Sequence, residues 1–307
     1  MVKCFYHNAD LDGICSAAIV HQKYPDAELI GIDYGDPFPW DTIRPGEDVW
    51  MVDFSLQPFS DMVRLRQLAT LTWIDHHVSA IGDRPKAWRG IQVVGIGACA
   101  LVWDFIYGGT TDTEPRPRAV ELLAKYDVWN FDDSDTLAFQ YGIRTYELSN
   151  DPCHSGWEGI FTGDWVQDEA LMLGNAIVKY IERDNALKAR ALCFDHTLRL
   201  SQGDFERLSG SLLSLDVKKE IARLFPIHCL AANFGPSNSK LFDSLWDPEK
   251  YDAMLLFSYR PKNKLWTISL YTTRDDVDCS VVAKAYGGGG HKMAAGFQIK
   301  TLVEIGL

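Results

Sequence analysis

The sequence has few of the features that mark secreted, zinc-finger or membrane-spanning proteins. Its seven cysteines are odd in number, and no two of them form a Cys-x-x-Cys pair. Several lie inside apolar runs, which is typical of reduced, buried thiols rather than of disulfides or structural zinc sites. We find no signal peptide, low-complexity tract or internal repeat, and the longest uncharged run, Gly90 to Trp103, is too short and glycine-rich to cross a bilayer. These absences predict a cytoplasmic protein.

Basic residues are also scarce. The chain has 42 acidic residues against 30 lysines and arginines, which gives a net charge of −12. Proteins that grip long duplex nucleic acid make many phosphate contacts through basic side chains, so a partner of this kind is not expected. A small anionic substrate remains compatible with the charge, because bound metal ions would invert the local potential.

The length and composition allow substantial cores. The chain has 307 residues, of which 47% are hydrophobic and 12% aromatic, as expected for one large or two medium domains. Its first part alternates short apolar runs with helical patterns, which predicts right-handed crossovers and a mostly parallel sheet. The predicted strands are Val2–Tyr6, Leu29–Ile32, Val49–Val52, Leu71–Ile74 and Ile91–Val94, and the predicted helices are Gly13–Tyr24, Pro58–Leu68, Gly97–Tyr107 and Arg118–Tyr126.

The remainder of the chain has a different pattern. Strand signals stop at Trp165, and a helical pattern continues to about Leu200. Beyond it, the chain alternates again, with predicted helices at Val217–Leu224 and Cys279–Tyr286 and predicted strands at Ile227–Ala232, Ala253–Tyr259 and Leu265–Tyr271. We predict an α/β protein of two domains. An N-terminal domain with a mostly parallel sheet flanked by helices (1–164) is joined by a helical linker (165–205) to a smaller mixed-sheet domain (206–307).

Asp75, His76 and His77 follow the predicted strand Leu71–Ile74 directly. Ligands bind where strands end in open α/β sheets, and one acid with two imidazoles can ligate a metal or orient its ligands. The alternative is a solvated turn in which two histidines are adjacent by chance.

A second polar group lies between the first predicted strand and the first predicted helix. His7, Asp10 and Asp12 fall in this turn, and carboxylates at alternate positions can address two ions. The alternative is a turn with a helix N-cap, since aspartate is common in both.

Single aspartates end two further elements. Asp53 follows the predicted strand Val49–Val52, where a carboxylate could bridge two metal ions, although a simple strand-ending acid is the alternative. Asp127 follows the predicted helix Arg118–Tyr126, and acids flanked by aromatic residues are common at helix ends. Together with the histidines, these residues describe an oxygen-rich, imidazole-supplemented site that suits Mn²⁺ or Mg²⁺. Two ions roughly 3.5–4 Å apart catalyse in-line phosphoryl displacement.

A run of four glycines, Gly287 to Gly290, precedes His291 and Lys292. Consecutive glycines can present backbone N–H groups to an anion without obstruction by side chains. The alternative is a flexible linker, but linkers do not usually lead into His-Lys and an apolar run of small residues.

Taken together, these motifs resemble those of the DHH/DHHA1 phosphoesterases over nearly the whole chain and in the same order. The resemblance is carried by Asp75-His76-His77, by the preceding stretch His7-Asn8-Ala9-Asp10-Leu11-Asp12 and by Gly287-Gly288-Gly289-Gly290-His291. It implies a catalytic DHH domain with two Mn²⁺ or Mg²⁺ ions and a DHHA1 domain that holds the substrate. Family members include nanoRNases, single-strand exonucleases, cyclic-dinucleotide phosphodiesterases and 3′-phosphoadenosine 5′-phosphate phosphatases.

The resemblance also implies roles for the individual residues. His7 and Asp10 would hold one metal ion, Asp12, His76 and Asp127 the other, and Asp53 would bridge the two. Asp75 would orient the ligands, and His77 would contact the scissile phosphate or the leaving oxygen. Gly287, Gly288, Gly289, Gly290 and His291 would bind the terminal nucleotide of the substrate.

The sequence departs from the family pattern at two places. The step from His7 to Asp10 is shorter than in many relatives, and Ala9 stands where proline is common. In addition, Tyr271 stands where many nanoRNase-like members have an arginine.

From these features we predict a Mn-dependent phosphodiesterase that hydrolyses short single-stranded oligonucleotides by a two-metal mechanism, as a nanoRNA-type exonuclease. Its partners would be short oligonucleotides or small nucleotides, with no membrane, and a homodimer is compatible with the sequence. One alternative is a phosphatase or phosphodiesterase acting on 3′,5′-bisphosphate nucleotides or cyclic dinucleotides. Another is an inactive protein that binds nucleotides as a regulatory module.

Overall fold

The computed structural model describes residues 2–82, 88–108, 115–163, 165–199, 215–235 and 237–307. The chain divides into two compact units, Met1–Lys179 and Tyr180–Leu307, which are described separately. The boundaries predicted at 164 and 205 for the functional domains stay predictions. No helix within the described ranges is long and apolar enough to span a bilayer.

The first unit is built on a parallel four-stranded sheet in the order β2-β1-β3-β4, which confirms the predicted fold class. The strands are β1 (Val2–His7), β2 (Glu28–Ile32), β3 (Asp48–Val52) and β4 (Thr70–Ile74). The fifth strand predicted at Ile91–Val94 is wrong, because this segment forms only an isolated bridge between Gln92 and Asp75. Gly90, at a φ of +118°, lies so close to β4 that a Cβ would be 1.9 Å from the Trp73 carbonyl oxygen. The segment therefore passes the sheet edge in a conformation that does not continue as a strand.

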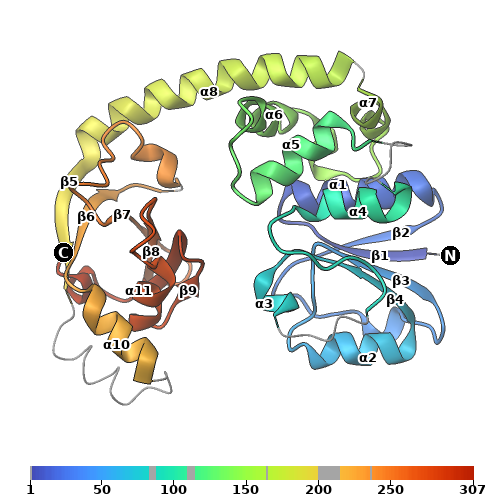
Figure 1. Cartoon of the computed structure of the whole chain (residues 1–307), viewed down its shortest axis with the longest axis horizontal. Helices are drawn as coiled ribbons and strands as arrows, with labels where there is room; N and C mark the ends of the chain where they lie inside the picture. Colours follow the sequence, from blue (N-terminus) through green and yellow to red (C-terminus); the bar gives the residue numbers. More distant parts are fainter. Residues whose placement is uncertain (1, 83–87, 109–114, 164, 200–214, 236) are drawn as a thin grey trace. The chain divides into compact units, whose positions relative to one another are not determined.

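Alternate residues of each strand face opposite sides of this sheet. In β3, Trp50 and Val52 belong to one buried cluster, whereas Val49 and Met51 belong to another. Helices α1 (Leu11–Lys23) and α4 (Ala98–Tyr107) cover one face, and α2 (Ser60–Leu68) covers the other (Figure 1). Because both faces are covered, the strands are apolar throughout, as parallel strands usually are.

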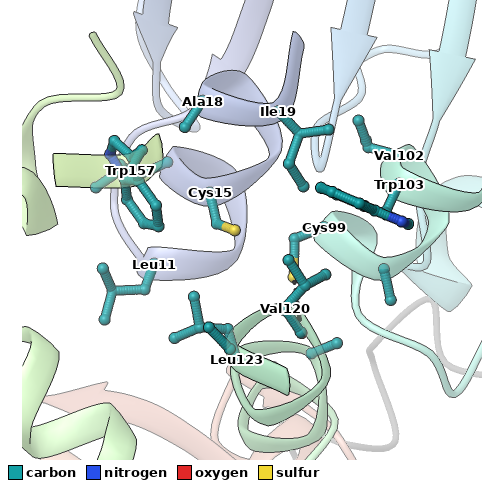
Figure 2. Close-up of a cluster of buried hydrophobic side chains, with 14 of the residues drawn as sticks. Leu11, Cys15, Ala18, Ile19, Cys99, Val102, Trp103, Val120, Leu123 and Trp157 are labelled. Carbon is teal, nitrogen blue, oxygen red and sulfur yellow. Dashed lines mark hydrogen bonds between the residues drawn. The ribbon is translucent and has the colours of Figure 1, made fainter. Parts of the chain in front are cut away.

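The larger of the two clusters joins the sheet to a second layer of helices. Figure 2 shows Leu11 and Cys15 of α1, Cys99 of α4 and Leu123 of α5 converging in this core, with Trp157 at its edge. The layer contains α5 (Arg118–Asp127), α6 (Asp135–Ile143) and α7 (Gly156–Thr162), and the unit also has the short helices α3 (Val78–Ile81), η1 (Trp40–Thr42) and η2 (Glu147–Asn150). Packing of α5 against this core holds its C-terminal end, and thus Asp127, in a fixed position.

Helices α6 and α8 (Trp165–Leu192) cross at two glycines. A Cβ on Gly142 of α6 would lie 1.7 Å from the Ala170 carbonyl oxygen, and a Cβ on Gly174 of α8 would lie 1.7 Å from the Ala138 carbonyl oxygen. Backbone thus meets backbone at both points, which only glycine permits. The crossing ties the beginning of α8 to the first unit.

The second unit contains a mixed six-stranded sheet in the order β5-β6-β7-β8-β10-β9, in agreement with the predicted mixed α/β domain. Among the described strands of this sheet, β6 and β7 pair in parallel and the other neighbours are antiparallel. The strands are β5 (Cys193–Leu198), β6 (Ile227–Asn233), β7 (Ala253–Arg260), β8 (Leu265–Tyr271), β9 (Gly289–Gly290) and β10 (Ala294–Ile299), and the helices are α10 (Leu215–Leu224), α11 (Cys279–Ala285), η3 (Ser239–Leu241) and η4 (Leu302–Ile305).

The predicted helical linker differs from the structure at its end. The helix that begins at Trp165 stops at Leu192, and Cys193–Leu198 forms the edge strand β5 instead of continuing the helix. Its pairing with β6 supplies the backbone hydrogen bonds that a helix would otherwise make. Residues 200–205 of the predicted linker lie outside the described part of the chain.

Candidate metal centre

The order of the strands brings the predicted site residues to one edge of the parallel sheet. β1 and β3 are neighbours, and the connections that leave them run to opposite sides, so a topological switch point lies between them. His7 ends β1, Asp53 follows β3 and Asp75 follows β4. Since the strands are parallel, their carboxyl ends, and these three side chains, meet at the same edge.

The first turn of α1 delivers two carboxylates to this edge. Asp10 is the N-cap of α1, and its Oδ1 accepts a hydrogen bond from Gly13 N at 3.0 Å. Asp12 accepts hydrogen bonds from the backbone N–H groups of Ala98 and Cys99, at 2.5 and 2.7 Å, and so caps α4 from a different helix. Capping and metal binding are therefore not exclusive alternatives here, because each carboxylate oxygen has a lone pair beyond the one that accepts an amide.

Asp53 has an unusual backbone. Its φ is +55°, in the left-handed region, and its side chain is only 1% exposed. Non-glycine residues adopt this conformation rarely, although aspartate tolerates it better than most. The turn directs the Asp53 carboxylate along the sheet edge, with one oxygen toward His7 and the other toward His76.

Two groups of possible metal ligands share this carboxylate. In the first, His7 Nδ1 lies 3.0 Å from Asp10 Oδ2 and 3.7 Å from Asp53 Oδ2. In the second, His76 Nε2 lies 3.0 Å from Asp127 Oδ2 and 3.2 Å from Asp53 Oδ1.

Asp12 completes the second group, since its Oδ2 lies 3.7 Å from His76 Nε2. Within each group of His7, Asp10 and Asp53 or of Asp12, His76 and Asp127, the ligand atoms all lie within 4.8 Å of one another. The structure thus brings together all six residues that the resemblance assigned to metal binding, in the same division. That they bind metal ions stays a prediction.

His77 and Asp75 form a pair beside these groups. His77 Nδ1 lies 2.8 Å from Asp75 Oδ1, and the same oxygen accepts the backbone N–H groups of His76 and His77. The other Asp75 oxygen accepts a hydrogen bond from Trp73 Nε1. Asp75 is fully buried, and burial lowers the pKa of His77 while Asp75 raises it more, so that the net shift is upward. This pairing leaves Nε2 of His77 available to a ligand.

Several buried polar atoms at the site lie close to opposite charges but make no well-aligned hydrogen bond within the described part of the chain. They are Nδ1 of His7, both carboxylate oxygens of Asp53 and Nε2 of His76. These are the atoms that point into the two groups, and burying them without hydrogen bonds costs free energy. Divalent cations would satisfy them, and oxygen and imidazole ligands without thiolates are what Mn²⁺ and Mg²⁺ prefer. The residues fit a pair of such ions.

The electrostatics of the site reflect an excess of negative charge. Burial lowers the pKa of His76, but Asp127 and Asp53 raise it more, to about 11. Burial also lowers the pKa of His7, which Asp10 and Asp53 raise to about 10. Both imidazoles are therefore protonated at neutral pH when no metal ion is bound.

The pKa values of two of the carboxylates are raised as well. Burial raises the pKa of Asp12, and the charges of Asp53 and Asp127 raise it further. Burial likewise raises the pKa of Asp53, although His7 and His76 partly oppose the shift. Burial and the neighbouring carboxylates thus both disfavour the ionised forms of Asp12 and Asp53 when no metal ion is bound.

Metal binding should accordingly release protons. A histidine ligates metal as the neutral imidazole, so loading both groups at pH 7.5 should displace about two protons, from His7 and His76. Calorimetric titrations with MnCl₂ in buffers of different ionisation enthalpy measure this number directly. Apparent affinity should rise with pH as long as these protons must be displaced. Binding heats that do not depend on the buffer would contradict this expectation.

Asp33 and Tyr34 also lie at the site, although no sequence motif marks them. Asp33 Oδ1 lies 3.3 Å from His7 Nε2, and the Tyr34 ring packs edge-on to the His7 ring at 5.6 Å. Such a carboxylate fixes the orientation of an imidazole whose other nitrogen faces a metal. The pattern that could have revealed it is the one used for Asp53, since Asp33 also follows a strand of the same sheet.

The glycine run of the second unit is more ordered than a loop of free N–H donors. The N–H groups of Gly287 and Gly288 bond back to α11, and Gly289–Gly290 forms β9 against β10. His291 N donates to the Ala294 carbonyl oxygen. The expected row of unobstructed amides is therefore not present, and the assignment of these residues to substrate binding stays a prediction.

Comparison with known proteins identifies a domain in the C-terminal part of the chain. Residues 239–305 match the DHHA1 domain. The chain carries a DHHA1 domain. This match agrees with the C-terminal part of the resemblance that the sequence motifs indicated. An uncharacterised protein, R106 of Acanthamoeba polyphaga mimivirus, is 24% identical over 292 residues, or 93% of this chain, and the chain spans 59% of the length of that relative.

Solved structures with similar folds are more distant. A pGpG-specific phosphodiesterase, PggH from Vibrio cholerae, is 12% identical with a TM-score of 0.49 and is covered to 93%, while 97% of this chain is covered. An exopolyphosphatase-related protein from Bacteroides fragilis is 15% identical with a TM-score of 0.42, with 98% of this chain and 87% of that one covered. RecJ from Thermus thermophilus, solved with Mg²⁺, is 12% identical with a TM-score of 0.39. The match covers 99% of this chain and 47% of RecJ. Similarity at this level assigns no substrate to this protein.

Proposed function

We propose that this protein is a divalent-metal-dependent phosphodiesterase that hydrolyses short oligonucleotides. The observation that carries the proposal is the position of Asp53 between the two ligand groups. Its Oδ2 lies 3.7 Å from His7 Nδ1, and its Oδ1 lies 3.2 Å from His76 Nε2. Two ions of the Mn²⁺ or Mg²⁺ type, when bound there, would supply a clamp for the scissile phosphate and an activated water. Mn²⁺ is our first choice because each group includes an imidazole.

The chain's own residues would then divide the work. His7 and Asp10 would hold one ion, Asp12, His76 and Asp127 the other, and Asp53 both. His77, held by Asp75 through Nδ1, would hold a proton at Nε2 for the phosphate or the leaving oxygen. Its pKa, which Asp75 raises against the effect of burial, favours this protonated form.

The substrate class rests on charge and on the DHHA1 domain. A net charge of −12 disfavours long nucleic acid, whereas a metal pair compensates the charge of one or two phosphates locally. We assign the terminal nucleotide to residues 287–291, where Gly289 is exposed and has open space around its Cα.

Chelation followed by metal restoration tests the proposed function. Protein stripped with EDTA should lose at least about 10³-fold of its activity toward a 5′-phosphorylated dinucleotide, and Mn²⁺ or Mg²⁺ should restore it. A panel of short RNAs, cyclic dinucleotides and a 3′,5′-bisphosphate nucleotide identifies the preferred substrate by kcat/KM.

Matched histidine variants connect this result to the site. His76→Ala should lose both activity and bound Mn²⁺, whereas His228→Ala, an exposed histidine of the second unit, should lose neither. Turnover that survives exhaustive chelation would refute metal dependence. Nucleotide binding in EDTA without any hydrolysis would instead identify a regulatory binding protein.

A further inference from the structure

Trp129 has a backbone conformation that is costly for its side chain. Its φ is +59°, and among the described residues only Asp53 and Lys264 are other non-glycine residues with positive φ. A bulky side chain in the left-handed region is an outlier, and such strain gathers at ligand-binding positions. One of the other two, Asp53, is itself a predicted metal ligand.

The Trp129 side chain is also poorly covered for so large an apolar group, since it is 50% exposed. It lies with Tyr126 and Phe131 in a cluster of three rings, with centroids 5.8 Å from Tyr126 and 5.0 Å from Phe131. The two rings pack against the indole, and about half of Trp129 stays exposed to solvent. A planar ligand could stack on an aromatic side chain that is held by neighbouring rings and still exposed to solvent.

The turn that carries Trp129 is held firmly at both ends. Trp129 N donates to the Tyr126 carbonyl oxygen at 3.0 Å, and Asn130 N donates to the Lys125 carbonyl oxygen at 2.8 Å. Just beyond, Asp133 pairs with Arg118 of α5. The indole is therefore presented by a fixed turn.

The position of this turn relates the indole to the metal centre. Asp127, whose Oδ2 lies 3.0 Å from His76 Nε2, is two residues before Trp129. Two peptide units span at most ~7 Å, so the two Cα atoms lie within that distance. A ribose and its exocyclic carbon separate a nucleobase from its phosphate by a comparable length. The turn that carries Trp129 therefore lies about one nucleoside length from the ligand Asp127.

From these observations we infer that Trp129 is a stacking platform for a nucleobase of the substrate. The inference rests on the proposed function and adds a residue that binds the nucleobase of the substrate. Stacking is tolerant of base identity, because every base has a π face. Trp129 therefore selects nucleotides over other phosphate esters and does not select among bases.

The test compares a 5′-phosphorylated dinucleotide with the same diester lacking both bases, in the Mn²⁺-loaded protein. Trp129→Gly should lower kcat/KM for the dinucleotide by about 10- to 100-fold, mainly through KM, and should lower it much less for the abasic diester. Trp129→Phe retains a ring and should keep most of the discrimination. Glycine relieves the left-handed strain but removes the ring contacts with Tyr126 and Phe131, so the unfolding temperature of Trp129→Gly is measured alongside its activity to establish that it is folded.

Lys264→Gly provides the matched control, because Lys264 has a φ of +54° in the β7–β8 turn of the other unit. This variant gains the same backbone relief and should not change the ratio of the two substrates. Equal loss on both substrates in Trp129→Gly, or no change in their ratio, would overturn the inference.

A binding measurement separates the inference from the proposed function. The fluorescence of 2-aminopurine riboside 5′-monophosphate should be quenched by the Mn²⁺-loaded wild type, because stacking quenches it, and much less by Trp129→Gly. Quenching that depends on Trp129 without hydrolysis of any ester would sustain the platform and refute the phosphodiesterase. Hydrolysis of dinucleotides with quenching that is absent, or equal in both proteins, would refute the platform and leave the phosphodiesterase intact.

Discussion

Asp53→Asn is expected to abolish hydrolysis while stabilising the metal-free protein. The shared carboxylate faces both ligand groups, so its loss should lower kcat by about 10³-fold or more and reduce bound Mn²⁺ toward zero. Asparagine also tolerates the left-handed φ of +55°, so the turn should persist. His7→Ala, which removes a ligand of one group only, should leave more residual activity.

The stabilisation follows from the direction of the pKa shift. Because burial raises the pKa of Asp53 in the folded state, its ionised form destabilises the fold at neutral pH. Asparagine removes this penalty, and the free energy of unfolding without metal should rise by about 1–3 kcal/mol. The gain should shrink as the pH falls toward roughly 4, where the carboxyl group is protonated in both states.

Urea unfolding in EDTA and in excess Mn²⁺ measures both effects. The wild type should gain stability with Mn²⁺ and Asp53→Asn should not, so that their order reverses between the two conditions. Asp26→Asn, which removes an exposed carboxylate in the turn before β2 and outside both ligand groups, controls for the change in net charge. A destabilised Asp53→Asn protein in EDTA would show that the carboxylate holds the fold together, contrary to this account.

Gly13→Ala should damage stability and metal binding together. A Cβ at Gly13 would lie 1.9 Å from the His7 carbonyl oxygen and 2.7 Å from its carbonyl carbon, and neither is the end of a flexible side chain. The first turn of α1 would have to move away from β1 and take Asp10 and Asp12 with it. We expect the free energy of unfolding to fall by about 2–4 kcal/mol and the Mn²⁺ affinity to fall at least about 10-fold.

Gly163→Asn is the matched control for this substitution. Gly163 has open space around its Cα and a φ of +75°, which asparagine accepts at small cost. Chemical denaturation and the Mn²⁺ content after gel filtration compare the two variants. If Gly13→Ala kept the stability and metal content of the wild type, α1 could not approach β1 as closely as described.

The sequence predicted the parallel sheet well because local and long-range signals agree there. Short apolar runs alternate with helical patterns, and polar residues follow the runs directly. Since parallel strands end at one edge, His7, Asp53 and Asp75 could be placed together before any coordinates were known. The directions of the two Asp53 carboxylate oxygens, by contrast, depend on the left-handed backbone conformation of Asp53. The presence of an aspartate in the sequence does not predict that conformation.

Other elements escaped prediction for identifiable reasons. Helix α6 buries Thr136, Gln140 and Gly142, so its inner face carries little hydrophobic periodicity. Strand β5 follows α8 without an intervening glycine or proline, and its pairing with β6 alone distinguishes it from a further helical turn. The glycine run was expected to present free amides. In the structure, these residues instead bond to α11 or pair with β10. Both contacts are made with other elements, so the local sequence pattern could not predict them.

The crossing of α6 and α8 has a consequence for how the sequence can drift during evolution. At Gly142 and at Gly174 the obstacle to a side chain is the carbonyl oxygen of the opposite helix, which every amino acid carries. No exchange on the partner helix can therefore make room for a larger residue, as a smaller neighbour could in an ordinary core. In related proteins that keep this crossing, we therefore expect glycine at each of the two positions. A substitution at either position should not be accompanied by a compensating substitution on the other helix.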